Sequence, residues 1–275
     1  MKYLKQGLLI VLAIIFILNN NLSYAQSGNK TFTWPEGKKM GLTLTFDDAR
    51  VSTIDNGIPM LDKYNVKATF YVSIGTMVQR LEGWKIAIRN GHEIGNITFN
   101  HPCTGNYLFS RNSALEDYTL DKMQVDLDSA NLVIKEMLGI VPVSFAYPCG
   151  QKFVGRGINT QSYVPLISAM FETGRGSNDE RPNDPSFCDF AQLTCMGLDL
   201  KSFDDIKKLI DYATKYGSWL ILSGHQVDEG IDPTFSSTIE EICKYAMDAS
   251  NGIWIDNVHN IASYIKQNRP DIISK

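Results

Sequence analysis

The chain has 275 residues, of which 44% are apolar and 20% are charged, and its formal net charge is −4. This is ordinary globular composition, and the length allows one large domain or two small ones. A mildly acidic chain without basic clusters is a poor candidate for binding nucleic acid or an anionic membrane surface, whereas a neutral glycan fits the charge balance.

The first 25 residues have the pattern of a secretory signal peptide. Lys2 and Lys5 form a basic start, Gly7–Leu18 is an apolar run, and Ser23-Tyr24-Ala25 gives a small-x-small cleavage pattern. The alternative is an uncleaved membrane anchor, but a spanning helix needs about 20 apolar residues and this run is shorter. Cleavage after Ala25 predicts export to the periplasm, the cell surface or the medium, with no membrane span in the mature chain.

Cleavage removes two lysines and no acidic residue, so it changes the net charge from −4 to −6. Residues 26–37 are polar and contain Gly, Pro and Lys, and we expect them to form an unpacked lead-in. Residues 38–275 show no interdomain linker and no repeat, and they are predicted to form one domain.

From Met40 onward, short apolar runs alternate with amphipathic stretches. Runs that are rich in β-branched and aromatic residues, or bounded by Gly and Pro, predict strands, and apolar residues spaced at three and four predict helices. The predicted strands are 39–46, 66–74, 91–97, 142–148, 168–174, 218–224 and 252–258, and the predicted helices are 54–64, 115–138, 202–217 and 236–252. Repeated strand-then-helix units predict a parallel α/β sheet or barrel, with its site at the carboxyl ends of the strands.

Four segments place polar groups at such ends. The first strand runs into Asp47 and Asp48, which repel each other unless a cation compensates; a solvated turn is the alternative. His101 is a residue type that binds zinc well. The loop that contains Cys149 can aim backbone N–H groups at an oxyanion. His225 ends an apolar strand and is either a structural residue or a general acid.

Together these motifs resemble the polysaccharide deacetylases with a NodB-homology domain. They are TFDD, KATFYV, GHEIGNITFNHP, FAYPCG and LILSGH, in this order, and the resemblance covers about residues 38–267. It implies a distorted (β/α) barrel and metal-dependent hydrolysis of N-acetyl groups on a glycan substrate.

The resemblance also implies a role for each matched residue. Asp47 matches the general base and His225 the general acid, while Asp48 and His101 match ligands of a divalent metal, with zinc favoured. The backbone N–H near Cys149 matches the oxyanion donor, and Tyr147 and Pro148 lie with it on the substrate side.

The sequence departs from the family pattern at two positions. Ile97 stands where a second histidine ligand is expected, four residues before His101, so the implied metal site is weakened and the metal can be absent. Ala146 replaces an arginine that steadies the base, and Arg175 is a candidate substitute. Neither His92 nor His259 matches a ligand, and both are predicted to be structural.

Two functions therefore remain open from the sequence. The first is an active carbohydrate deacetylase with an altered metal site, and the second is a glycan-binding pseudoenzyme that lost catalysis through Ile97. The five cysteines leave at least one thiol unpaired, and both Cys188–Cys195 and Cys103–Cys149 are possible disulfides.

Overall fold

The computed structural model describes residues 32–269, and its centre is an eight-stranded sheet in which every paired strand is parallel. The strand order is β7-β4-β3-β2-β1-β9-β8, and β10 pairs with β1 beside this path. The strands are β1 (Met40–Asp47), β2 (Thr69–Val72), β3 (Glu93–Asn96), β4 (Ser144–Ala146), β7 (Thr173–Arg175), β8 (Met196–Gly197), β9 (Trp219–Gly224) and β10 (Ile253–Ile255). A separate antiparallel hairpin joins β5 (Phe153–Val154) to β6 (Gln161–Ser162).

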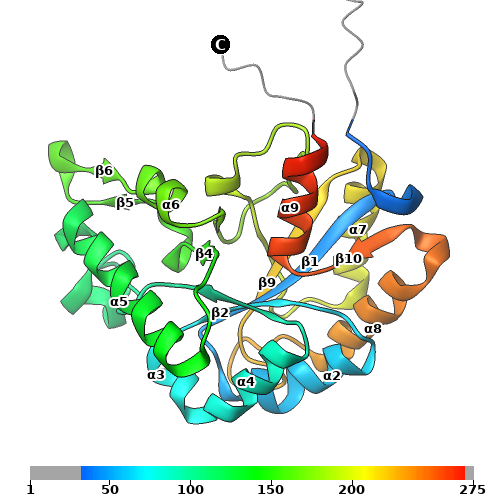
Figure 1. Ribbon diagram of the computed structural model, residues 1–275, viewed down its shortest axis with the longest axis horizontal. Helices are drawn as coiled ribbons and strands as arrows, with labels where there is room; N and C mark the ends of the chain where they lie inside the picture. Colours follow the sequence, from blue (N-terminus) through cyan, green and yellow to red (C-terminus); the bar gives the residue numbers. More distant parts are fainter. Residues whose placement is uncertain (1–31, 270–275) are drawn as a thin grey trace, which may run out of the picture.

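Helices surround the curved sheet (Figure 1). They are α2 (Ile58–Lys63), α3 (Ile74–Met77), α4 (Leu81–Arg89), α5 (Leu120–Leu138), α6 (Val164–Met170), α7 (Phe203–Tyr216), α8 (Ser236–Met247) and α9 (Val258–Asn268). All eight residues of β1 are buried, because helices pack on one face of this strand and the interior of the curved sheet covers the other. Parallel strands buried on both faces have this continuous apolar character.

The prediction of an α/β fold that forms a distorted (β/α) barrel in a single domain is confirmed, and the parallel sheet forms a half-barrel. The two edge regions of the sheet meet through one parallel bridge between Arg175 and Leu193. The Leu193 N–H donates to Gly174, and the Gly176 N–H donates back to Leu193. This bridge brings the end of β7 round toward β8 and β9, which carries Arg175 toward the interior.

The structure corrects part of the predicted element assignment. Residues 168–174 were expected to form a strand, but Ser168–Met170 end helix α6 and only the last part pairs as β7. The long predicted helix starts later, at Leu120, where the Thr119 hydroxyl caps it by accepting from the Lys122 N–H.

The described part of the lead-in is packed, contrary to expectation. Trp34 is buried, and its Nε1 donates to the Gly217 carbonyl oxygen at 2.9 Å. Gly41 makes room for it, because a Cβ at this position would lie 2.7 Å from the Trp34 ring. The predicted signal peptide lies outside the described residues. Within residues 32–269, no helix has the length and apolar character that crossing a membrane requires.

Candidate functional site

Strand register brings the candidate residues together. Phe46 on β1 is opposite Gly224 on β9, so the next residues, Asp47 and His225, leave neighbouring strands side by side. On the other side of β1, Asp47 is opposite Tyr71. The pairing of β1 with β9 joins segments that are nearly 180 residues apart in the sequence. Both pairings place these residues at the carboxyl ends of the strands, where sites of parallel α/β folds lie.

Asp47 is 6% exposed and forms a buried ion pair with Arg175. The Arg175 guanidinium also lies over the Tyr71 ring, 4.4 Å from its centroid. Burial lowers the pKa of Arg175, but the charge of Asp47, the smaller effects of Cys195 and Tyr71, and the hydrogen bond to Asp47 together raise it above its ordinary value. The pair thus fixes the carboxylate of Asp47 in one orientation.

Asp48 is 7% exposed and has a left-handed backbone, with φ of 70°. Its Oδ1 accepts from the Ser73 hydroxyl at 3.3 Å and lies 3.4 Å from the His101 Nδ1. Its Oδ2 accepts from the Arg50 guanidinium at 2.7 Å. The sequence reasoning missed Arg50, although a cation two residues after paired carboxylates was a usable signal.

Ile97 is 2% exposed and packs in a small apolar cluster with Tyr71 and Ala146. The register explains this contact, because Asn96 on β3 is opposite Phe145 on β4, which places Ile97 next to Ala146. Ala146 is in turn opposite Arg175 on β7. The two departures from the family pattern therefore touch each other. Arg175 reaches Asp47 on β1 from β7, the strand that pairs with β4.

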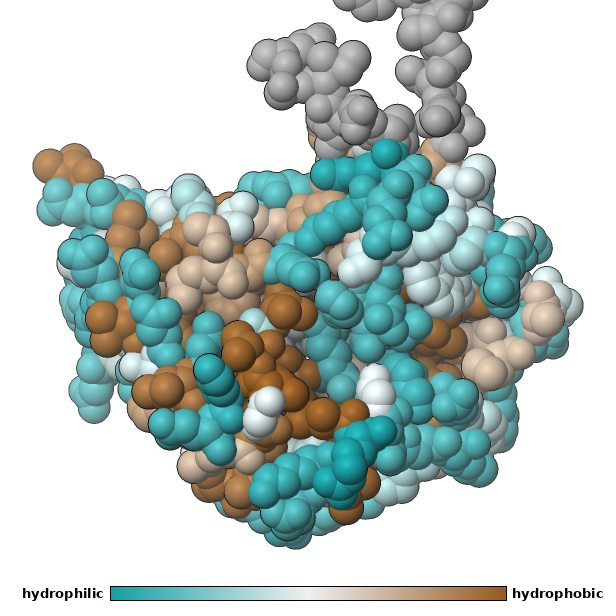
Figure 2. Space-filling model, in the orientation of Figure 1, coloured by the Kyte–Doolittle hydropathy of each residue, from teal (hydrophilic) through white to brown (hydrophobic). Residues whose placement is uncertain are grey.

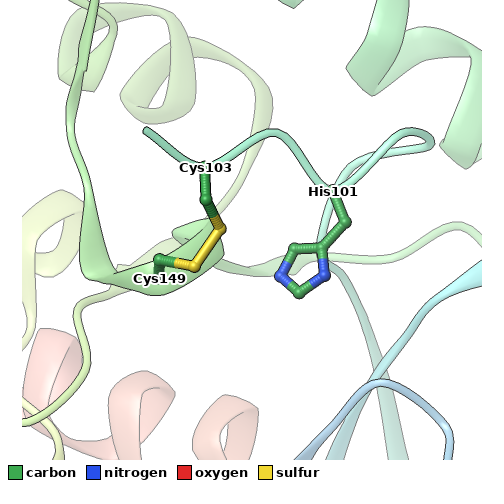
Figure 3. A group of neighbouring side chains, drawn as sticks. All are labelled: His101, Cys103 and Cys149. Carbon is green, nitrogen blue, oxygen red and sulfur yellow. A yellow bond between two sulfur atoms is a disulfide. The ribbon is translucent and has the colours of Figure 1, made fainter. Parts of the chain in front are cut away.

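His101 lies beside a disulfide between Cys103 and Cys149 (Figure 3), whose Cα atoms are 5.8 Å apart. A ring nitrogen of His101 and the two sulfur atoms lie within 4.8 Å of one another. Oxidised sulfurs are not thiolate ligands, so this group is not a zinc site in the disulfide form. The disulfide instead ties the loop after β3 to the loop after β4. Cys188, Cys195 and Cys243 are free thiols, so the possible Cys188–Cys195 pairing is not formed.

His225 pairs with Asp199, a residue that the sequence reasoning missed. The His225 Nδ1 lies 2.6 Å from the Asp199 Oδ2, and the His225 N–H donates to the other oxygen of this carboxylate at 3.0 Å. Burial lowers the pKa of His225, but the hydrogen bond to Asp199 and the charges of Asp47, Asp199 and Asp48 raise it to about 9. The signal for Asp199 was an acidic residue two positions after the short strand β8.

The other two histidines have structural contacts. The His92 Nδ1 accepts from the Ala68 N–H at 3.1 Å, so Nε2 carries the proton and faces Asp62, also at 3.1 Å. Burial lowers the pKa of His92, despite the opposing effect of Asp62. On α9, His259 lies 3.1 Å from Glu172.

The loop after β4 corrects one predicted contact. Tyr147 was expected on the substrate side, but its side chain is buried in the core, where its hydroxyl donates to the Ala191 carbonyl at 2.8 Å. Pro148 is buried as well, while Cys149 is exposed and has φ of 52°. Only the exposed end of this loop, at Cys149, is therefore placed to present backbone groups to a ligand.

The donor set can be tested against a divalent metal. Two ligands of a tetrahedral zinc ion, each about 2.0–2.1 Å from the metal, lie about 3.4 Å apart. The 3.4 Å between Asp48 Oδ1 and His101 Nδ1 fits this spacing. Ile97 offers no third donor, whereas catalytic zinc sites have three protein ligands, and Arg50 competes for Asp48. The residues fit a weakly held divalent ion.

The fold and site define a parallel α/β protein with paired carboxylates and histidines at the strand ends. Residues 35–161 match the family described as Polysaccharide deacetylase, and this part of the chain belongs to that family. The match includes Asp47, Asp48, His101 and Cys149, while His225 lies beyond it.

One curated relative is a peptidoglycan-N-acetylglucosamine deacetylase of Listeria monocytogenes. It is 33% identical over 155 residues, which are 56% of this chain and 30% of the relative. The matched part of this chain spans about a third of the length of the curated relatives.

Solved structures share the fold at low sequence identity. A polysaccharide deacetylase from Mycobacterium smegmatis aligns with a TM-score of 0.60 and 16% identity, over 90% of this chain and 98% of that one. A family 4 acetyl xylan esterase from Clostridium thermocellum, solved with a cobalt ion, aligns with a TM-score of 0.53 and 18% identity, over 84% of this chain and 93% of that one. A mutant of a CE4 family pseudoenzyme with restored enzymatic activity aligns with a TM-score of 0.50 and 20% identity, over 84% of this chain and 70% of that one.

Proposed function

We propose that this chain is a metal-dependent hydrolase that removes N-acetyl groups from an extracytoplasmic polysaccharide or oligosaccharide. The reaction breaks a carbon–nitrogen bond that is not a peptide bond. The observation that carries the proposal is the convergence of Asp47, Asp48, His101 and His225 at the ends of β1, β3 and β9. The name of the Listeria relative, which acts on N-acetylglucosamine of peptidoglycan, supports an N-acetylated glycan as substrate.

Each side chain has a distinct task in this reaction. Asp47, oriented by Arg175, accepts a proton from the attacking water. His225, which is protonated at neutral pH because its pKa is about 9, gives a proton to the departing amine. The backbone at Cys149 donates to the developing oxyanion. Asp48 and His101 would hold a divalent metal, zinc in our proposal, which would supply Lewis-acid polarisation of the acetyl carbonyl and of the attacking water.

The location is part of the same proposal. The basic start, apolar run and Ser23-Tyr24-Ala25 pattern support export of the chain. A disulfide between Cys103 and Cys149 is compatible with an oxidising compartment. Glycans of the cell envelope are then the substrates within reach.

A second function has an observation of its own. Ile97 fills the place of a ligand with a buried side chain, and Arg50 supplies Asp48 with a positive charge that needs no metal. These contacts support a glycan-binding pseudoenzyme, which binds its glycan without turnover. The two functions predict different results for the same assay.

The test measures acetate release from a hexamer of N-acetylglucosamine by the chain without residues 1–25, with excess zinc or cobalt. We expect slow, chelator-sensitive release that Ile97→His raises at least tenfold, because a third ligand holds the metal more tightly. Ile97→Val is the matched control, since it keeps an apolar side chain.

The outcomes separate the functions. Release by Ile97→His alone, with oligomer binding by both proteins, would support the pseudoenzyme. Acetate release that persists in the presence of a chelator would rule out the metal-dependent mechanism.

A further inference from the structure

Two adjoining cavities start at the loop after β4 and follow the β5–β6 hairpin. The first has a volume of about 440 Å³ and includes Gly150, Gln151 and Phe153 in its lining. The second has about 740 Å³ and extends to Ile158. Both are lined by Glu116 and Gly155, so they form one depression, which we call the distal groove. The hairpin projects at the left end of the molecule in Figure 1, and Figure 2 shows a hydrophobic tip there.

The distal groove begins next to the catalytic candidates. Gly150, in its lining, directly follows Cys149, whose sulfur lies within 4.8 Å of a His101 ring nitrogen. His101 is in turn 3.4 Å from Asp48. The distal groove therefore begins close to the place where one unit of a chain-like ligand at Asp48 would lie.

The lining suits a neutral, hydroxyl-rich ligand. Phe153 is 58% exposed, and its ring faces a cavity instead of the core. Around it are hydrogen-bonding side chains of both charges: Glu116 and Asp117 are acidic, and Lys152 and Arg156 are basic. An exposed aromatic ring among balanced polar groups favours a ligand with apolar faces and many hydroxyls, as a sugar has.

Hydrogen bonds within the protein fix the polar wall of the distal groove, which consists of Glu116, Thr104 and Gln151. Glu116 accepts from the Thr104 hydroxyl at 2.5 Å and from the Gly105 N–H at 3.0 Å. The Thr104 N–H donates to the Gln151 Oε1 at 2.7 Å, which leaves the NH₂ group of Gln151 as the donor for a ligand. The adjacent disulfide joins the same two loops. A fixed wall loses little conformational entropy on binding.

We propose that the distal groove binds further sugar units of the glycan whose N-acetyl group lies at Asp47 and His225, with Phe153 stacking against a sugar ring. This inference rests on the proposed function and adds to it a preference for long oligomers. It applies equally to a hydrolase and to a glycan-binding protein, because it concerns binding and not turnover.

The test is calorimetric titration of the chain with the dimer, tetramer and hexamer of N-acetylglucosamine. Affinity should rise with length, and Phe153→Ala should weaken hexamer binding about threefold to tenfold, the range expected for one stacking contact. Dimer binding should change less than twofold. Phe153→Tyr, which keeps the ring, should bind like the natural chain. Phe187→Ala is the matched control, because Phe187 is 77% exposed and lines a different cavity.

Two results would overturn the proposal in distinguishable ways. If oligomers bind or release acetate but Phe153→Ala behaves like Phe187→Ala at every length, the distal groove has no role and the proposed function stands. If no oligomer binds and none releases acetate, both the groove and the glycan function are wrong.

Discussion

Arg175 is a single side chain whose removal should strongly lower the stability of the fold. It is fully buried and is the ion-pair partner of Asp47, which is itself buried. Removing one partner of such a pair leaves an uncompensated charge in the interior, so Arg175→Ala should lower the free energy of unfolding by about 3–5 kcal/mol. Urea unfolding measures this loss.

Arg80→Ala is the control for Arg175→Ala, because Arg80 pairs with Asp55 and both side chains of that pair are more than 40% exposed. It should cost at most about 1 kcal/mol. Equal losses in the two variants would contradict the structural role assigned to Arg175.

His225 predicts a pH dependence whose sign follows from its raised pKa. The folded pKa is about 9 against an ordinary value of 6.5. The charged imidazole therefore stabilises the fold fully below pH of about 6.5, and this contribution is lost as the pH rises through about 9. Asp199→Asn removes the carboxylate whose hydrogen bond raises the pKa of His225 most, so that only the charges of Asp47 and Asp48 oppose the effect of burial, and it should flatten this loss.

NMR titration of the His225 ring measures its pKa directly. We expect a pKa near 9 in the natural chain and a clearly lower value in Asp199→Asn. Asp117→Asn, which alters an exposed pair with Arg156, should leave the titration unchanged. An unshifted His225 titration in Asp199→Asn would show that Asp199 does not control this histidine.

At the level of elements, sequence patterns predicted the strands better than the connections between them. The buried runs of β1, β2 and β9 and the capped helices α5 and α7 carry local signals that tertiary contacts reinforce. Helix α6 was missed because its sequence, VPLISAM, is short and apolar, and such runs do not distinguish a strand from a helix.

The site was predictable where a motif or a strand end marked it. The four candidate residues follow or lie near strand ends, and the structure brings them together at the carboxyl ends of the strands: Asp47, Asp48, His101 and His225. Contacts set by register were not predictable in the same way. The packing of Ile97 on Ala146 and the pairing of His225 with Asp199 depend on which strands are neighbours, and strand order cannot be derived from local patterns.

At the scale of the whole molecule, metal affinity can be read from stability, because an ion that binds only the folded chain raises its melting temperature. A two-donor site at Asp48 and His101 predicts a weak effect. With a Kd of about 1 mM, 1 mM cobalt or zinc adds only about 0.4 kcal/mol, or about 1 °C for a chain of this size.

Ile97→His should change this result if its imidazole enters the same site. A Kd of about 10 µM would give about 2.7 kcal/mol at the same metal concentration, a shift of about 5–10 °C. Ile97→Val should behave like the natural chain, because it adds no donor. A natural chain that shifts as much as Ile97→His would show that a third ligand already exists, and the weak-site explanation would then be wrong. This measurement needs no substrate, so it tests the metal site separately from the choice of glycan.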